Sequence, residues 1–144
     1  MAKDDSGLSA EEREAVKERA KELRAQQKAG KNREAGTTSV LAAIADLVPE
    51  DRALAEGLHR VVSEVAPDLV PKTYYGMPGY ANEEGKIVVF LSPSAKFKNR
   101  YATIGFEDRA RLDDGDMWPT SFAVTAWTPE VEKRVSALVA TAVA

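Results

Sequence analysis

Cysteine is absent from this 144-residue chain, and histidine occurs once, as His59. Without cysteine the chain can form no disulfide, zinc–thiolate site, cysteine nucleophile or protein-ligated iron–sulfur cluster. It also has no apolar run long enough to span a membrane, and its charged N-terminal residues lack the basic start and apolar middle of a secretory signal. These absences predict a cytoplasmic protein with no membrane partner, and the length fits a single hydrophobic core.

Charge is unevenly distributed along the sequence. The whole chain carries a formal net charge of −3, but the stretch from Lys17 to Arg33 has seven basic residues and two acidic ones, a local net charge of +5. A basic segment of this kind can contact nucleic-acid phosphates without reading the base sequence. The alternative is a charged, solvent-facing helix whose acidic-first, basic-last order suits the helix dipole.

The N-terminal residues have the pattern of a charged helix with little apolar surface. Ser9 and Glu12 form a capping box that predicts a helix start, and Gly30 predicts its C-terminal end. Residues 31–38 are then expected to be a linker. The predicted organisation is a helical arm with its linker at residues 1–35, followed by a domain at residues 36–144.

Apolar periodicity changes from helical to strand-like and back again within residues 36–144. Strands clustered between helices, with connections too short for most crossover helices, predict the α+β class with an antiparallel sheet and helices packed on one face. The predicted elements are helices at residues 39–48, 49–66 and 129–142 and strands at residues 73–75, 80–81, 87–91, 100–106 and 122–127.

Standard catalytic motifs are missing, including a Walker loop, a dinucleotide fingerprint and the G-x-S-x-G and H-E-x-x-H patterns. The single histidine, His59, follows Leu58 on the amphipathic face of a predicted helix. It is therefore expected at the boundary of the core, with metal binding or base catalysis as the alternative. A non-enzymatic protein is the favoured prediction.

A group of aromatic and basic side chains is the first candidate ligand site. Aromatic and methionine side chains that line a concavity bind small organic molecules, although the same residues also build ordinary cores. Lys96, with Lys98 and Arg100, would attract an anion or protect an exposed strand edge. The candidate ligand-binding residues, around a tight turn at residues 76–79, are Tyr74, Tyr75, Met77, Tyr80, Lys96 and Trp118.

A cluster of carboxylates is the candidate metal site. Hard cations, and weakly held ferrous iron, take oxygen ligands of this type, whereas a solvated acidic turn is the alternative. The candidate metal-binding residues, grouped around Gly115, are Glu107, Asp108, Asp113, Asp114 and Asp116.

Several segments together resemble the YdhG-like domain-of-unknown-function family, from about Val40 to Ala142. The segments are PDLVPKTYYGMPGY at residues 67–80, KIVVF at residues 86–90, KFKNRYATIGF at residues 96–106 and the closing helix. The resemblance implies a frataxin-like two-layer fold. It also implies a binding protein such as the iron chaperones of one bacterial branch, which serve iron–sulfur and haem synthesis, and it carries over no catalytic residue.

The leading hypothesis is therefore a non-enzymatic YdhG-like binding protein that handles weakly bound Fe²⁺ through exposed carboxylates. Two alternatives stay open. One is a nucleic-acid-associated protein acting through the basic arm between Lys17 and Arg33, and the other is small-molecule binding at the turn between Tyr74 and Tyr80.

Overall fold

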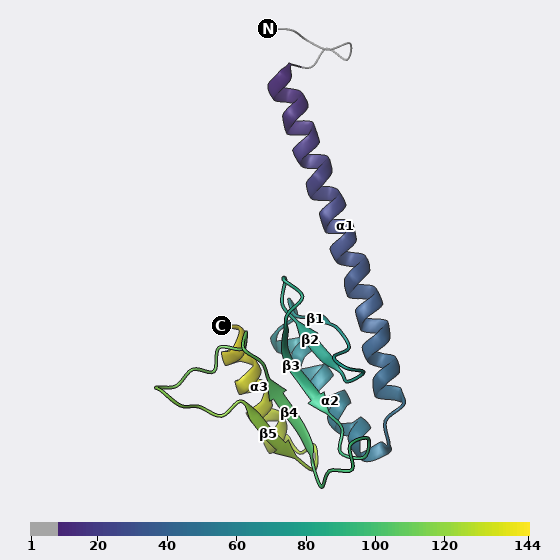
Figure 1. Cartoon of the computed structure of the whole chain (residues 1–144), viewed down its shortest axis with the longest axis vertical. Helices are drawn as coiled ribbons and strands as arrows, with labels where there is room; N and C mark the ends of the chain where they lie inside the picture. The colour runs from purple at the N-terminus through teal and green to yellow at the C-terminus, as the bar shows by residue number, and fades with distance from the viewer. Residues whose placement is uncertain (1–8) are drawn as a thin grey trace. The chain divides into compact units, whose positions relative to one another are not determined.

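The computed structural model describes residues 9–144, apart from the side chains of residues 22, 25, 26, 29 and 31. Neighbouring strands of its five-stranded sheet are all antiparallel and follow chain order, β1-β2-β3-β4-β5 (Figure 1). This arrangement confirms the predicted α+β class. The elements are α1 (Ala10–Ala45), α2 (Pro49–Val65), β1 (Val70–Pro71), β2 (Gly79–Ala81), β3 (Ile87–Ser92), β4 (Ala102–Phe106), β5 (Ser121–Val124) and α3 (Pro129–Val143).

The chain divides into two compact units between Glu34 and Ala35, and α1 contributes residues to both. The predicted helix start is confirmed, since the Glu12 N–H donates to Ser9 Oγ at 3.1 Å. In the described part of the first unit, the large aliphatic side chains of Val16 and Leu23 are both about half exposed. Within the described residues, no helix has the length and apolar character needed to cross a membrane.

The predicted end of the first helix at Gly30 and the predicted linker at residues 31–38 are wrong. Residues 31–45 continue α1, and Gly30 is not among the glycines with a left-handed backbone. A helix-ending glycine stops a helix by adopting that conformation, whereas a glycine that keeps helical dihedrals only weakens it. Gly30 therefore weakens α1 at this position but does not end the helix.

Gly36, inside the predicted linker, marks a close contact between α1 and β1. A Cβ atom at Gly36 would lie 1.9 Å from the carbonyl oxygen of Pro71, so only glycine allows the two backbones this approach. The following turns of α1 then bury Val40 and Ile44 in the same core as the sheet. The stretch predicted as a linker is in fact a packed helical segment.

One face of the sheet is buried and the other is open, because side chains alternate between the faces along each strand. Val89 and Leu91 of β3 pair with Phe106 and Ile104 of β4, and all four are buried. Helices α2 and α3 lie together behind this face in Figure 1. Gly57 of α2 contacts the indole of Trp127, which leaves no room for a side chain there.

Strand predictions succeed at the centre of the sheet and fail at its first edge. The central strand β3 was predicted within one residue, and the β4 and β5 predictions overlap the observed strands. The first strand was placed at residues 73–75, whereas β1 is Val70–Pro71 and Tyr74 forms only an isolated bridge with Met77. Residues 107–116, between β4 and β5, form turns and irregular chain.

Gly36 and Gly30 provide a matched pair for testing the packing of α1. Gly36→Ala should lower the free energy of unfolding by about 1–3 kcal/mol, because the new methyl group collides with the Pro71 carbonyl. Gly30→Ala should leave stability unchanged or raise it by up to about 1 kcal/mol, since nothing lies within 4 Å of its Cβ position. Urea unfolding followed by circular dichroism measures both, and equal effects of the two substitutions would contradict the packed segment.

Candidate functional site

Three aromatic rings lie in a row on the open face of the sheet. Phe90 points away from the helices, and its ring lies over Gly105 of β4, where a Cβ would come within 2.4 Å of the ring. Tyr74 packs beside Phe90 with ring centroids 5.1 Å apart, and Tyr75 packs edge-on against Tyr74 at 4.8 Å. We call Tyr74, Tyr75 and Phe90 the ring row.

The end of the ring row is held by a two-residue turn. Tyr74 and Met77 exchange two backbone hydrogen bonds of 2.8 and 2.9 Å, which leaves Tyr75 and Gly76 as the turn. Both have positive φ angles, 50° and 78°, the pattern of a type I′ hairpin turn. Counted with its flanking pair, the turn spans residues 74–77, two residues before the turn predicted at residues 76–79, and Gly79 belongs to β2.

A groove of about 470 Å³ adjoins the ring row on the open face, and Tyr74 is the member of the row that lines it. Tyr74, Ile87 and Lys86 line it, together with Glu107 and its neighbours. The Tyr74 hydroxyl donates to Glu107 Oε1 at 3.5 Å. Burial, and then the nearby negative charge of Glu107, raises the pKa of Tyr74, so the hydroxyl stays protonated at neutral pH and can donate to a ligand.

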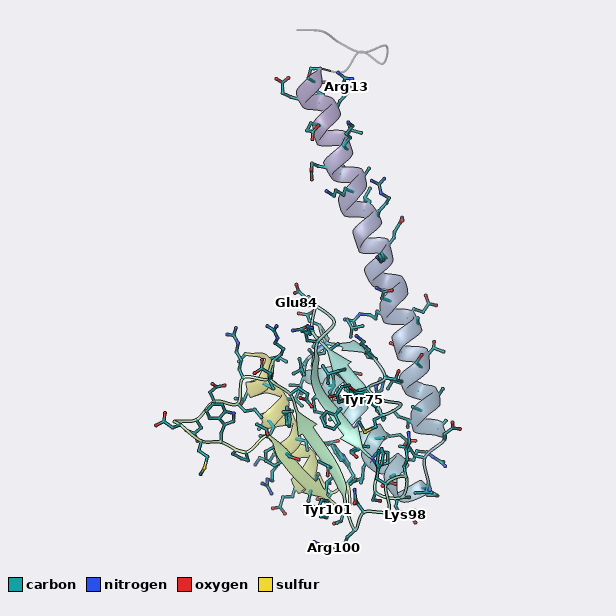
Figure 2. All side chains as sticks on the ribbon, in the orientation of Figure 1. Arg13, Tyr75, Glu84, Lys98, Arg100 and Tyr101 are labelled. Carbon is teal, nitrogen blue, oxygen red and sulfur yellow. The ribbon has the colours of Figure 1, made fainter. Side chains whose placement is uncertain are left out.

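The connection between β3 and β4, residues 94–101, forms a second exposed surface that we call the basic loop. It contains Lys96, Lys98 and Arg100 with the partly exposed rings of Phe97 and Tyr101. Lys98 has a left-handed backbone with φ of 55°. Figure 2 shows Lys98, Arg100 and Tyr101 at the same end of the sheet.

A buried carboxylate holds the base of the basic loop. Asp51, in the first turn of α2, is 1% exposed and accepts hydrogen bonds from Ser94 N (3.1 Å), Ser94 Oγ (2.7 Å) and Ala95 N (3.0 Å). Burial alone would raise the pKa of Asp51, but the bonds from Ala95 and Ser94 outweigh it and lower the pKa. The ionised form of Asp51 therefore positions the loop.

The structure brings only some of the predicted ligand-binding residues together. Tyr74 and Tyr75 adjoin each other, and the Lys96 Nζ lies 3.1 Å from the position of a Cβ on Gly76. Tyr80 and Met77 are instead buried, 1% and 8% exposed. Trp118 packs against the core, and the ring contacts among the described residues do not join it to the tyrosines.

His59 lies where its sequence context predicted, at the boundary of the core. Its Nδ1 is 2.9 Å from the Tyr80 hydroxyl, which gives that buried group a partner. Burial lowers the pKa of His59 and raises the pKa of Tyr80, so both are neutral at physiological pH. His59 also lines an apolar groove of about 310 Å³ with Leu41 and Ile44.

The five candidate metal-binding carboxylates are all exposed. Glu107 and Asp108 adjoin the open-face groove, whereas Asp113, Asp114 and Asp116 follow on the extended segment around Gly115. Among the described residues, no three histidine, aspartate or glutamate side chains come together as a metal site. Iron binding by these residues stays a prediction.

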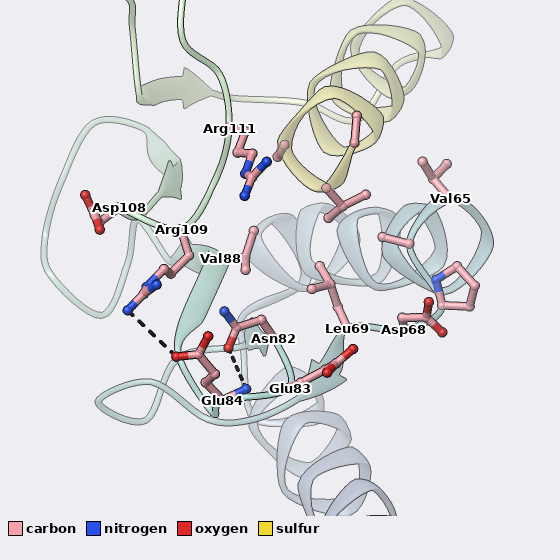
Figure 3. A pocket seen from close by; sticks show the side chains of 15 residues that line it. Val65, Asp68, Leu69, Asn82, Glu83, Glu84, Val88, Asp108, Arg109 and Arg111 are labelled. Atoms are coloured by element: carbon pink, nitrogen blue, oxygen red, sulfur yellow. Dashed lines mark hydrogen bonds and ion pairs between the residues drawn. The ribbon is translucent and has the colours of Figure 1, made fainter.

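The largest depression, about 740 Å³, lies near the C-terminal ends of α2 and α3 (Figure 3). Its lining contains both charge signs and no aromatic side chain. Arg109 lies 3.8 Å from Glu84, and Asn82 Oδ1 accepts the backbone N–H of Glu84 at 3.0 Å. This depression therefore offers fewer features for binding an organic ring than the open-face groove.

Phe90, Lys86 and Asp51 were missed as contributors to the site. The continuous apolar run around Phe90 does not show on which face its ring lies, and only the register with Gly105 shows that the ring lies outside. Asp51 pairs with residues 43 and 44 positions away, which no local pattern indicates.

No protein-family model, curated protein or solved structure matches the chain. The YdhG-like resemblance accordingly stays a prediction, and function is argued from the geometry.

Asp51→Asn should lower the free energy of unfolding by roughly 1–3 kcal/mol at neutral pH, because the charged acceptor of three hydrogen bonds is lost. The folded-state pKa of Asp51 is lowered, so its contribution is complete above about pH 4, the unfolded value, and is lost as pH falls through the folded-state value. The difference between wild type and variant should therefore shrink in acid, as measured by urea unfolding across pH.

The exposed Asp46→Asn is the control for Asp51→Asn and should change stability by less than about 0.5 kcal/mol. A stability difference for Asp51→Asn that stays constant through the acid range would show that the carboxylate charge is not what holds the loop.

Proposed function

We propose that this chain is a cytoplasmic, non-enzymatic protein that binds a small aromatic anion in the open-face groove beside the ring row. The proposal rests on the exposure and the backbone conformation of Tyr75. This residue is 83% exposed and has a left-handed backbone at a turn position that favours asparagine, aspartate or glycine.

Tyr75 is unfavourable for stability and suitable for binding. A bulky side chain with positive φ costs on the order of 1 kcal/mol or more, and such residues cluster at ligand-binding sites. Burial does not offset this cost, because most of the ring faces solvent. Tyr75 does not line the groove itself. Its edge-on contact with Tyr74, which does, holds the Tyr75 ring next to the groove, where it can cover a bound molecule.

The groove and its surroundings indicate the class of ligand. Tyr74 supplies an aromatic ring in the groove lining, with Tyr75 and Phe90 packed beside it, and the groove volume lies within the usual range for small-molecule sites. The groove lining has three basic residues, Lys72, Lys86 and Arg109, against two acidic ones, Glu107 and Asp108. Lys96 adjoins the turn, so an anionic substituent on the ligand would find an excess of positive charge around it. The Tyr74 hydroxyl, whose one proton is given to Glu107 at 3.5 Å, can turn from that long bond to donate to the ligand.

Binding without catalysis fits the titratable groups of the groove. The Tyr74 hydroxyl has a raised pKa and is a poor general base at neutral pH, and its partner Glu107 is exposed. Ferrous iron remains a ligand predicted by the family resemblance. We give the open-face groove precedence over it because rings, charge and a concavity coincide there.

Tyr75→Asn tests two expected effects of Tyr75, a favourable one on ligand affinity and an unfavourable one on stability. The variant should bind 2-naphthoate, a planar aromatic carboxylate used as the probe, about 3- to 10-fold more weakly in isothermal titration calorimetry, since one ring contact is lost. Its thermal stability should be equal to or higher than that of the wild type, because asparagine adopts the left-handed turn more easily.

Tyr75→Phe is the matched control and should keep the affinity within about twofold, since the ring stays and only the hydroxyl is removed. Unchanged affinity in Tyr75→Asn, or a wild type that does not bind the probe, would refute the site. A less stable Tyr75→Asn would refute the explanation for the strained tyrosine.

A further inference from the structure

The basic loop is the most positively charged exposed segment outside the N-terminal arm. No acidic residue occurs between Glu84 and Glu107, whereas three basic residues occur within residues 96–100. The ion pairs Arg60–Glu132 and Arg109–Glu84 both lie outside the loop. The loop charges are therefore available to an anionic partner despite the acidic character of the whole chain.

Protection of a strand edge does not explain these charges. The sheet order places β1 and β5 at the edges, and the basic loop joins β3 to β4, which are both paired on each side. The strand-edge interpretation of Lys96, Lys98 and Arg100 is therefore wrong. Their charge needs another explanation.

Aromatic rings alternate with the cations along the loop. Phe97 is 46% exposed with the Lys96 ammonium 5.7 Å from its ring centroid, and Tyr101 is 36% exposed with the Arg100 guanidinium at 5.3 Å. Each cation lies over its ring, so the part of the ring that stays exposed for stacking borders a positive charge. This combination is how proteins bind single-stranded nucleic acid, with bases on the rings and phosphates at the cations.

The loop is also held in place before any partner arrives. Asp51 fixes Ser94 and Ala95 from inside the domain. Within the loop, the Lys98 N–H donates to Ala95 O at 3.2 Å and the Asn99 N–H donates to Ser94 O at 2.9 Å. An ordered loop loses less conformational entropy on binding than a flexible one.

We propose that the basic loop binds single-stranded nucleic acid, with Phe97 and Tyr101 stacking on bases and Lys98 and Arg100 contacting phosphates. The interaction does not read the base sequence, because ring faces and cations accept any base and any phosphate. It is independent of the open-face groove, although Lys96 adjoins both surfaces.

Fluorescence anisotropy with a labelled 12-nucleotide oligothymidine and the full chain tests this proposal. Affinity should fall steeply between about 50 and 200 mM salt, and Lys98→Gln with Arg100→Gln should reduce the log–log salt slope by about 1.4. Phe97→Ala and Tyr101→Ala should each weaken binding about tenfold through lost stacking. An abasic strand of equal length should bind the wild type at least tenfold more weakly.

Lys133→Gln with Arg134→Gln provides the matched control, since it removes the same charge from exposed positions of α3 and should leave affinity within about twofold. The proposal is overturned by any of three results. The first is oligonucleotide binding that the loop substitutions leave unchanged, which would place the binding site on the N-terminal arm. The second is equal affinity for the abasic strand and the oligothymidine. The third is binding to phosphatidylglycerol vesicles without binding to the oligonucleotide.

Discussion

The alternation of side chains along β3 and β4 is the constraint on which the rest of the structure depends. Val89 and Leu91 must face the helices to build the core, and this register places Phe90, between them, on the opposite face. Gly105 then gives the Phe90 ring space to lie across the neighbouring strand. The burial of one face therefore creates an aromatic surface on the other, which α2 and α3 do not cover.

Two connections border this open face, and each contains a non-glycine residue with a left-handed backbone. Tyr75 occupies the turn before β2, and Lys98 lies in the basic loop. Lys96 extends from the loop toward Gly76, while Asp51 fixes the loop from the buried side. Conformational strain is thus found where exposed rings and cations are presented, which is the usual place for it in binding proteins.

Local patterns predicted the elements whose stability is itself local. The apolar stripe of α2 correctly indicated its buried face. The last helix was likewise placed correctly from local signals, and its first turn is capped by Thr128, whose Oγ1 accepts the Val131 N–H at 3.1 Å. The sequence also indicated Tyr74 and Tyr75 as neighbours at a turn. It failed where a distant contact decides the outcome, as at Gly36, whose partner Pro71 lies far along the chain.

The candidate site residues also divide into those that local patterns predict and those that depend on distant contacts. Tyr80 and Tyr75 are both tyrosines of the same short aromatic stretch. However, β2 directs Tyr80 inward to His59, whereas the turn directs Tyr75 outward. Only the strand register separates the two, and a one-residue error in placing the turn reverses the assignment. The role of Asp51 depends on the loop folding back onto α2, which charge and hydropathy patterns do not indicate.

The central claim is that the open sheet face is the binding face. Amide chemical-shift mapping by ¹⁵N–¹H NMR during a titration with 2-naphthoate tests it most directly. The account predicts saturable shifts at Tyr74, Tyr75, Gly76, Lys86 and Gly105, with little change at amides of the α2–α3 interface. Shifts concentrated instead around Asn82, Glu84 and Arg111 would place the ligand in the larger depression and contradict the account.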